Sequence, residues 1–257
     1  MKLAVCALAL ALVAVTGSAA TAQTLYSTGW EAAPASPAWN TGNISGQNTW
    51  VNFNAAAGHT VQNSGDNGVT AATGNRMHRS LASTGANFER DSWVDLTAAW
   101  AGRTVGNNTA VGSIDMFLET NMTTAGFHGL SIFSNAGQIG GIYVSASNGA
   151  IILLGTSQAV VGTITRGTWT NIGVAIDFTT GNLAAIVNGV TVGSVAFNNV
   201  TNTDIADIDL ANISGSAPTT SSSRMYTDNY LVRAIPTPGA LALVGLGGLV
   251  AARRRRA

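Results

Sequence analysis

Apolar and polar residues alternate with a period of two along most of this chain, and short turns rich in Asn and Gly interrupt the pattern about every ten residues. Ile114, Met116 and Leu118 occupy one side of the segment 112–119, and the segment 169–178 alternates in the same way. Successive side chains of a β-strand point to opposite faces, so this period indicates half-buried strands and not helices. We therefore predict an all-β fold, a two-sheet antiparallel jelly-roll sandwich.

Two hairpins can be predicted from their turns. Residues 183–187 and 190–197 flank Asn188-Gly189, a pair that supplies the two positive φ angles of a type I′ turn. The segments 140–146 and 150–154 are joined by Ser147-Asn148-Gly149 and predict a second pair of adjacent strands.

The first 22 residues have the pattern of a secretory signal. Lys2 precedes an apolar segment over residues 3–15, and Ala20-Thr21-Ala22 is a small-x-small cleavage site. We expect a signal helix that the Sec translocon and signal peptidase process between Ala22 and Gln23, with an uncleaved anchor as the alternative. The only cysteine, Cys6, lies inside the apolar segment and is not part of a Leu-x-Gly-Cys lipobox.

The last 23 residues form a second distinct segment. The motif Pro236-Thr237-Pro238-Gly239 leads into the apolar run 240–252, which ends in four adjacent arginines, Arg253, Arg254, Arg255 and Arg256. As a helix, residues 238–252 would extend about 22 Å, which is shorter than the hydrocarbon core of about 30 Å. Local thinning of the bilayer and arginine side chains that extend to the interface can make up the difference. The arginines favour a cytoplasmic C-terminus. A buried helix of the domain and a helix lying on a lipid surface are the alternatives.

A short proline motif, one hydrophobic segment and a terminal arginine cluster together resemble the PEP-CTERM sorting signal of Gram-negative bacteria, with Thr237 in the place of the family's glutamate. The resemblance implies that an exosortase in the inner membrane removes the tail. The protein would then be anchored only transiently before it reaches the cell surface or extracellular matrix. The expected organisation is a signal peptide over 1–22, a β-sandwich domain over 23–234 and a sorting tail over 235–257.

Processing at both ends would change the charge of the protein. Lys2 and the four terminal arginines account for five of the twelve basic residues, so seven arginines would remain beside twelve acids, a net charge near −5. A domain this acidic, without a basic patch, does not have the composition of a nucleic-acid-binding protein.

The strand 169–177, the Asn188-Gly189 hairpin and the closing strand 224–233 with its Asp228-Asn229 pair resemble concanavalin A-like, or laminin-G-like, jelly rolls. That family includes glycan-cleaving enzymes of the laminarinase and agarase type, which carry a Glu-x-Asp-x-(x)-Glu motif on one strand.

The matching segment of this chain has Ser113 in place of the nucleophile, followed by Asp115 and Glu119. Four residues along a strand separate those two carboxyls by about 13 Å, too far for two-carboxyl hydrolysis. We therefore expect a non-catalytic surface or matrix protein, with polysaccharide as its candidate ligand. A degenerate or unrecognised glycoside hydrolase and a purely structural coat component are the alternatives.

Tryptophans are candidates for a polysaccharide site. Trp30, Trp39 and Trp50 lie in a stretch rich in Asn, Gly, Ser and Pro, where exposed indoles could stack on sugars, although packing is the preferred interpretation. Trp93 and Trp169 alternate with polar neighbours and are expected to pack in the core.

Asp204, Asp207 and Asp209 are candidate ligands for Ca²⁺, with a solvated strand as the simpler interpretation. The histidines His59, His78 and His128 are scattered along the sequence and are expected on the surface or on edge strands. No cofactor, metal motif or catalytic triad is predicted.

Overall fold

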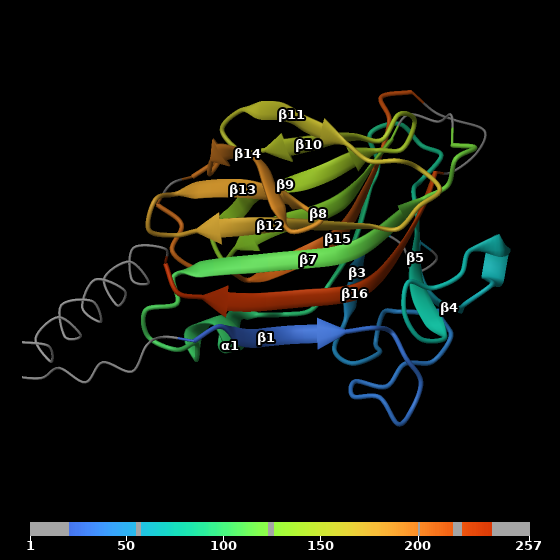
Figure 1. Cartoon of the computed structure of the whole chain (residues 1–257), viewed down its shortest axis with the longest axis horizontal. Helices are drawn as coiled ribbons and strands as arrows, with labels where there is room; N and C mark the ends of the chain where they lie inside the picture. The colour runs from blue at the N-terminus through green and yellow to red at the C-terminus, as the bar shows by residue number, and fades with distance from the viewer. Residues whose placement is uncertain (1–20, 55–57, 123–125, 200, 218–222, 238–257) are drawn as a thin grey trace, which may run out of the picture.

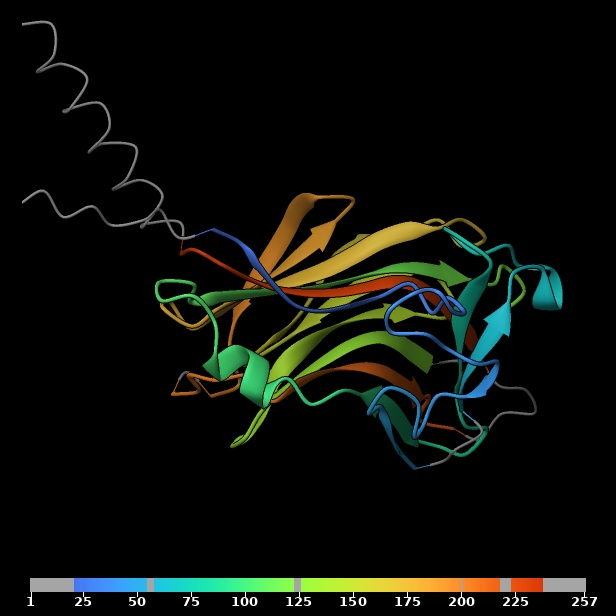
Figure 2. The same cartoon turned by 90° about the horizontal axis from the view of Figure 1, so that it is seen from below.

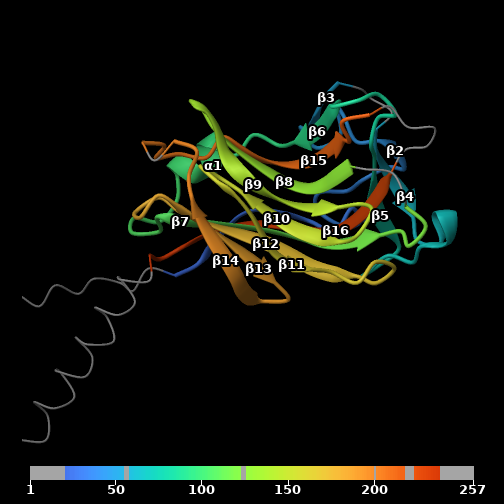
Figure 3. The same ribbon diagram turned by 90° about the horizontal axis from the view of Figure 1, so that it is seen from above.

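Two antiparallel β-sheets pack face to face in the computed structural model, which describes residues 21–54, 58–122, 126–199, 201–217 and 223–237 (Figure 1). The nine-stranded sheet has the order β14-β13-β12-β7-β16-β5-β4-β2, and β1 pairs with β16. The seven-stranded sheet has the order β11-β10-β9-β8-β15-β6-β3 (Figure 3). The predicted two-sheet antiparallel sandwich of the jelly-roll type is confirmed for the described residues.

The strands of the nine-stranded sheet are β1 (Gln23–Thr28), β2 (Gly42–Asn43), β4 (His59–Asn63), β5 (Arg76–Leu81), β7 (Thr109–Leu118), β12 (Thr170–Asp177), β13 (Asn182–Val187), β14 (Val190–Ala196) and β16 (Arg224–Ile235). Those of the seven-stranded sheet are β3 (Val51–Phe53), β6 (Glu89–Trp93), β8 (Gly126–Ser134), β9 (Gly137–Ser145), β10 (Ala150–Leu154), β11 (Gln158–Thr163) and β15 (Asp207–Ser214). A five-residue helix, α1 (Thr97–Ala101), and a 3₁₀ turn (Asp66–Gly68) complete the described elements.

The core lies between the two sheets and consists of the inward-facing residues of each strand. Ile114, Met116 and Leu118 of β7 are fully buried, as the alternation predicts, and Ile208 and Leu210 of β15 face them from the other sheet. Each fully buried aliphatic side chain stabilises the fold by about 1.5–3 kcal/mol relative to exposure. The outward-facing residues of each strand are not part of this core, and some of them form the site described below.

Both predicted hairpins are present. The β13–β14 turn has φ of 49° at Asn188 and 80° at Gly189, the two positive angles of a type I′ turn. Asparagine and glycine adopt this conformation at little cost, which explains their choice here. The β9–β10 pair is joined through residues 146–149, as predicted.

The two ends of the sandwich domain lie side by side. Gln23, the first residue of β1, pairs with Ala234 near the end of β16, and Figure 2 shows the blue first strand running along the red last strand. The Nδ2 atom of Asn107 bridges them by donating to the carbonyls of Thr21 at 2.8 Å and Ala234 at 3.2 Å.

Parts of both predicted sorting segments fall beyond the described ranges. Residues 1–20 of the expected signal segment over 1–22, the expected C-terminal helix, Pro238, Gly239 and Arg253 to Arg256 all lie outside them. Pro236 and Thr237 follow β16 directly. Within the described ranges, no helix has the length and apolar character needed to cross a bilayer.

Candidate functional site: an acidic and aromatic groove

The outer face of the seven-stranded sheet carries a cluster of acidic and aromatic side chains. In β6, Glu89, Asp91 and Trp93 alternate with residues that face the core, and in β15 Asp207 and Asp209 do the same. The two strands are neighbours, so both sets of side chains share one surface.

The register sets which of these residues meet. Ala211 pairs with Asp91 and Leu210 with Ser92, and the next step of this register places Asp209 beside Trp93. Asp91 and Asp209 therefore occupy diagonal positions on adjacent strands, close enough that the charge of Asp91 adds to burial in raising the pKa of Asp209. On the other side of β15, Asp207 pairs with Phe133 and Asp209 with Ser131 of β8.

These residues surround a hollow of about 430 Å³, which we call the acidic groove. Its lining consists of four acids, three aromatic residues and one serine: Glu89, Asp91, Asp207, Asp209, Phe53, Trp93, Phe133 and Ser134. The exposed Phe53 comes from β3, at the edge of the sheet.

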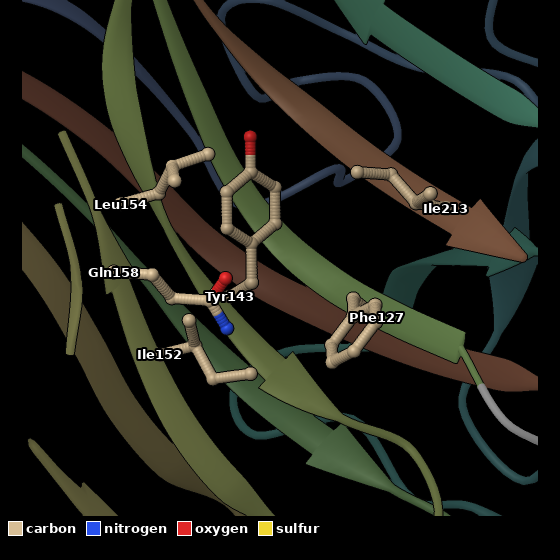
Figure 4. Close-up of a pocket in the computed structure, with 6 residues that line it drawn as sticks. All are labelled: Phe127, Tyr143, Ile152, Leu154, Gln158 and Ile213. Carbon is tan, nitrogen blue, oxygen red and sulfur yellow. The ribbon is translucent and has the colours of Figure 1, made fainter. Parts of the chain in front are cut away.

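A second hollow of about 140 Å³ lies on the same face, over β8, β9, β10 and β15 (Figure 4). It is more apolar and is lined by Phe127, Tyr143, Ile152, Leu154, Gln158 and Ile213. The hydroxyl of Tyr143 donates to Ser131 Oγ at 3.0 Å and lies close enough to Asp91 and Asp209 that their charges affect it. Gly141 leaves room for this ring, because a Cβ there would lie 2.7 Å from it.

Burial changes the protonation of the acids. Asp91 and Asp209 are each only 5% exposed. Desolvation raises the pKa of Asp91 to about 8, and repulsion from Glu89 and a proton shared with it contribute to the shift. Desolvation raises the pKa of Asp209 to about 10, with further contributions from Asp207. Burial also raises the pKa of Asp207. Asp91 and Asp209 consequently hold protons at neutral pH.

Several polar atoms of the groove have no hydrogen-bond partner among the described residues. One oxygen, Oδ1, of each of Asp91, Asp207 and Asp209 is buried and unpartnered. An unpartnered buried oxygen costs about 1–3 kcal/mol. These oxygens are enclosed, so a ligand in the groove reaches them only if the carboxyl groups rotate.

The proposed calcium ligands do not form one cluster. Asp204 does not line the acidic groove, and its Oδ2 accepts a hydrogen bond from the Nδ2 of Asn135. In the ranges that the structure describes, no three His, Cys, Asp or Glu side chains are arranged as metal ligands. The prediction of a solvated strand is also wrong for Asp209, because this face of β15 is hollowed and not flat.

Trp30, Trp39 and Trp50 are not an exposed sugar platform, and that candidate is wrong. They are 0%, 1% and 1% exposed and belong to the main core. The Trp30 ring lies 4.8 Å from that of Trp39 and 5.2 Å from that of Trp50, and Trp39 Nε1 donates to Thr28 Oγ1 at 2.7 Å. The loop that carries them folds back into the core, so the preferred packing interpretation describes them correctly.

The expectation for Trp93 and Trp169 also needs correction, because both are only partly buried. Trp93 lines the acidic groove. Trp169 packs beside Phe117 on the outer face of the nine-stranded sheet, where its Nε1 donates to the Thr70 carbonyl at 2.9 Å. Alternation identifies a face of a strand but does not say which face is covered.

The expectation of surface histidines is wrong as well, because His59, His78 and His128 are fully buried. His59 Nδ1 lies 3.1 Å from His78 Nε2, and the other nitrogen of His78 bonds to Thr227 Oγ1 at 2.8 Å. We call this set, completed by Ser80, Asn212 and Ser223, the histidine network. Packing of the two sheets brings β4, β5 and β16 against β8 and β15 around it, which sequence spacing does not reveal.

Ser113, Asp115 and Glu119, the segment compared with glycan-cleaving enzymes, lie in or next to β7 on the other sheet. Asp115 accepts hydrogen bonds from Asn171 and Asn229, each at 2.8 Å. Glu119 forms an ion pair with Arg224 at 3.3 Å and accepts from the Tyr226 hydroxyl. Both acids are held by structural partners.

The sequence analysis missed Glu89, Asp91, Phe53 and Phe133 as site residues. The alternation Glu89-Arg-Asp91-Ser-Trp93 is visible in the sequence and places two acids and an indole on one face. Only the pairing of β6 with β15 shows that this face joins that of Asp207 and Asp209.

Comparison with known proteins supports the fold. No protein-family model matches the sequence, and no curated protein matches it. The conserved carbohydrate esterase of Shiga toxin-encoding bacteriophage phi24B is similar in structure, with a TM-score of 0.53 and 9% identity over 84% of this chain and 100% of that one. The CBM2 module of the evolved Dit of Lactobacillus casei BL23 phage J-1 has a TM-score of 0.51 and 11% identity over 86% and 99%.

A sialidase also matches, with a TM-score of 0.51 and 9% identity over 74% of this chain, which spans only 17% of the sialidase. At these identities the similarity shows a shared jelly-roll architecture.

Proposed function

We propose that the sandwich domain is a non-catalytic polysaccharide-binding protein and that the acidic groove is its binding site. The observation that carries this proposal is a hollow of about 430 Å³ whose lining combines four carboxyl side chains with three aromatic rings. Sugar hydroxyls can donate hydrogen bonds to carboxyl oxygens. Trp93 and Phe133 supply apolar ring faces in the same hollow. The names of the structurally similar carbohydrate esterase and CBM2 module are compatible with this role.

A glycan array tests the binding function. The full chain would be purified in a detergent without a sugar headgroup, since such a headgroup could occupy the groove. We expect binding to at least one polysaccharide class, with loss of signal for Trp93→Ala and no change for Asp66→Asn, an exposed acid in the turn after β4. Equal binding by the wild type and Trp93→Ala would exclude the groove as the site.

We further propose that the chain is exported, cleaved before Gln23 and sorted to the cell surface or matrix by an exosortase that acts at Pro236-Thr237-Pro238-Gly239. The adjacency of Gln23 and Ala234 supports this, because both cleavages would fall just outside paired strands and leave the sandwich intact. Mass spectrometry of the exported protein should find Gln23 at the N-terminus and no peptide beyond the proline motif. A full-length extracellular chain ending at Ala257 would contradict the proposal.

Glycoside hydrolysis is the second candidate function, and one observation favours it. Asp209 and Asp91 hold protons at neutral pH beside other carboxyls, and such pairs supply the general acid and its partner in glycosidases. Release of reducing ends from polysaccharides, abolished by Asp209→Asn, would establish this activity. Binding without release of reducing ends would support the non-catalytic function.

A further inference from the structure

The acidic groove lacks any compensating positive charge among the described residues. Four carboxyls line it, and none of the interactions that shift the pKa of Asp91, Asp207 or Asp209 comes from an arginine. The chain has no lysine after Lys2. Arg90 is close in sequence but lies on the inward face, where its Nη1 donates to the Leu81 carbonyl at 2.8 Å.

This arrangement differs from that of the acids on the other sheet. Glu119 has Arg224 as its counterion, and both oxygens of Asp115 accept from side-chain amides. In the groove, Asp91 and Asp209 are nine-tenths buried and have no arginine partner among the described residues. Protons take the place of a counterion in the free protein, and a bound cation could displace them and pair with the carboxylates that remain.

We propose that the acidic groove binds a polysaccharide whose sugars carry free amino groups, and that it selects this class over neutral and uronic-acid polymers. The inference rests on the proposed function and specifies its ligand. A protonated amino group brings three N–H donors and one positive charge, which suit several converging carboxyl oxygens. Trp93 and Phe133 line the same hollow and can contact the apolar face of the ring that carries the amino group.

The same geometry disfavours the other classes. A uronic-acid polymer would bring like charges next to Glu89, Asp91, Asp207 and Asp209 in a site of low dielectric constant. A neutral glycan can donate hydroxyls to the carboxyl groups that line the groove, but it brings no positive charge to pair with a carboxylate. We therefore expect the charge of the ligand, and not its fit to the shape of the hollow, to determine which of the three polysaccharide classes binds most tightly.

Calorimetric titration of the full chain at pH 6.5 tests the inference. The ligands are a hexasaccharide of glucosamine, its fully N-acetylated counterpart, a neutral glucose hexasaccharide and a uronic-acid hexasaccharide. We expect the amino form to bind at least about tenfold more tightly than the acetylated form, in line with the strength of charge-assisted hydrogen bonds. The preference should weaken as salt is raised from about 0.05 to 0.5 M, because salt screens partly exposed charges.

Asp91→Asn and Asp209→Asn are the decisive variants, because they keep the shape of the side chain and remove the carboxyl that can give up its proton to pair with a bound ammonium group. Each should reduce the preference for the amino form to about threefold or less, while Asp66→Asn should leave it unchanged. Thermal melting of each variant will show whether it is folded. EDTA should have no effect on binding. A requirement for Ca²⁺ would mean that the missing cation is a metal and would overturn the inference.

The remaining outcomes separate this inference from the proposed function. Equal affinities, or a preference for the acetylated, neutral or uronic-acid form, would refute amino-sugar selectivity and leave polysaccharide binding standing. No binding of any of the four ligands by the folded protein would refute both.

Discussion

The histidine network and the acidic groove are both clusters of buried ionisable side chains, and the same two strands contribute to each. From β15, Asn212 reaches inward to His59 at 3.1 Å, whereas Asp209 faces outward into the groove. From β6, the carbonyl of Arg90 lies 3.2 Å from the same atom, His59 Nε2, while Asp91 faces the groove.

The difference lies in how the polar atoms are satisfied. Every ring nitrogen of His59, His78 and His128 has a partner within 3.2 Å, as expected for a cluster that supports the fold. In the groove, Asp91, Asp207 and Asp209 each keep a free oxygen. Oδ1 of Asn212 in the histidine network is also unpartnered, but it lies in the core, so the contrast rests on unpartnered atoms beside a hollow and not on burial alone.

The largest effect is expected from removing a member of the histidine network. His78→Ala would delete a ring that lies 5.1 Å from Trp30 and would leave His59 and Thr227 without their partners. We expect a loss of about 3–5 kcal/mol in the free energy of unfolding, measured by urea denaturation at pH 7. Glycan affinity of the folded fraction should not change. A loss below about 1 kcal/mol would mean that the network is not structural.

The two clusters should also respond oppositely to pH. Asp91 and Asp209 keep protons in the folded state to about pH 8 and about pH 10 but release them near pH 4 when unfolded. Their contribution to the free energy of unfolding is fully present below about pH 4. It falls by about 1.4 kcal/mol per pH unit for each group until the pH reaches the pKa of that group in the fold. Burial lowers the pKa of His59 to about 4 and that of His128 to about 3, so their contribution is lost as pH falls below 6.5.

Melting temperatures of the wild type and of an Asp91→Asn/Asp209→Asn double variant will separate these contributions. Between about pH 7 and 8 the wild type should lose stability, because Asp91 and Asp209 still hold their protons in the fold but are ionised in the unfolded chain, whereas the histidines are mostly neutral in both states. The double variant should have a higher melting temperature at pH 8 and lose this slope, while its decline below pH 6.5 should become clearer. Identical profiles would show that the two acids are not protonated in the fold.

A smaller effect is expected from Trp93→Ala. Because the indole is only partly buried, its removal should reduce oligosaccharide affinity by about tenfold, or roughly 1.4 kcal/mol, and change the free energy of unfolding by no more than that. Trp50→Ala is the matched comparison: it removes a core indole and should destabilise the fold by about 3–5 kcal/mol. If the two variants were equally destabilised, Trp93 would belong to the core.

The smallest effect is expected from calcium. Asp204 lies apart from the groove, and the described residues contain no set of three metal-ligating side chains, so millimolar Ca²⁺ and EDTA should give the same melting temperature within about 1 °C. A melting temperature that rises with Ca²⁺ in the wild type but not in Asp207→Asn would show that the acidic groove binds a divalent ion. The groove would then be a metal site with satisfied oxygens, like the satisfied nitrogens of the histidine network.

The sequence alone was sufficient for the local structure. Side-chain alternation identified β7, β12 and the strand pair β9–β10, and Asn188-Gly189 identified the β13–β14 hairpin, because both depend on neighbouring residues. It also placed Asp207 and Asp209 on one face of a strand. It predicted the sorting segments at both ends, and these remain predictions.

The tertiary structure determined which residues the two faces of each strand contact. It buried Trp30, Trp39 and Trp50, joined three histidines from distant strands and turned Trp93 outward into the groove. Each of these outcomes depends on which strands pair and in which register, and such pairings link residues more than a hundred positions apart, as β6 and β15 do. Alternation gives each strand two faces. Only the packing of the two sheets determines which face becomes the core and which forms a site.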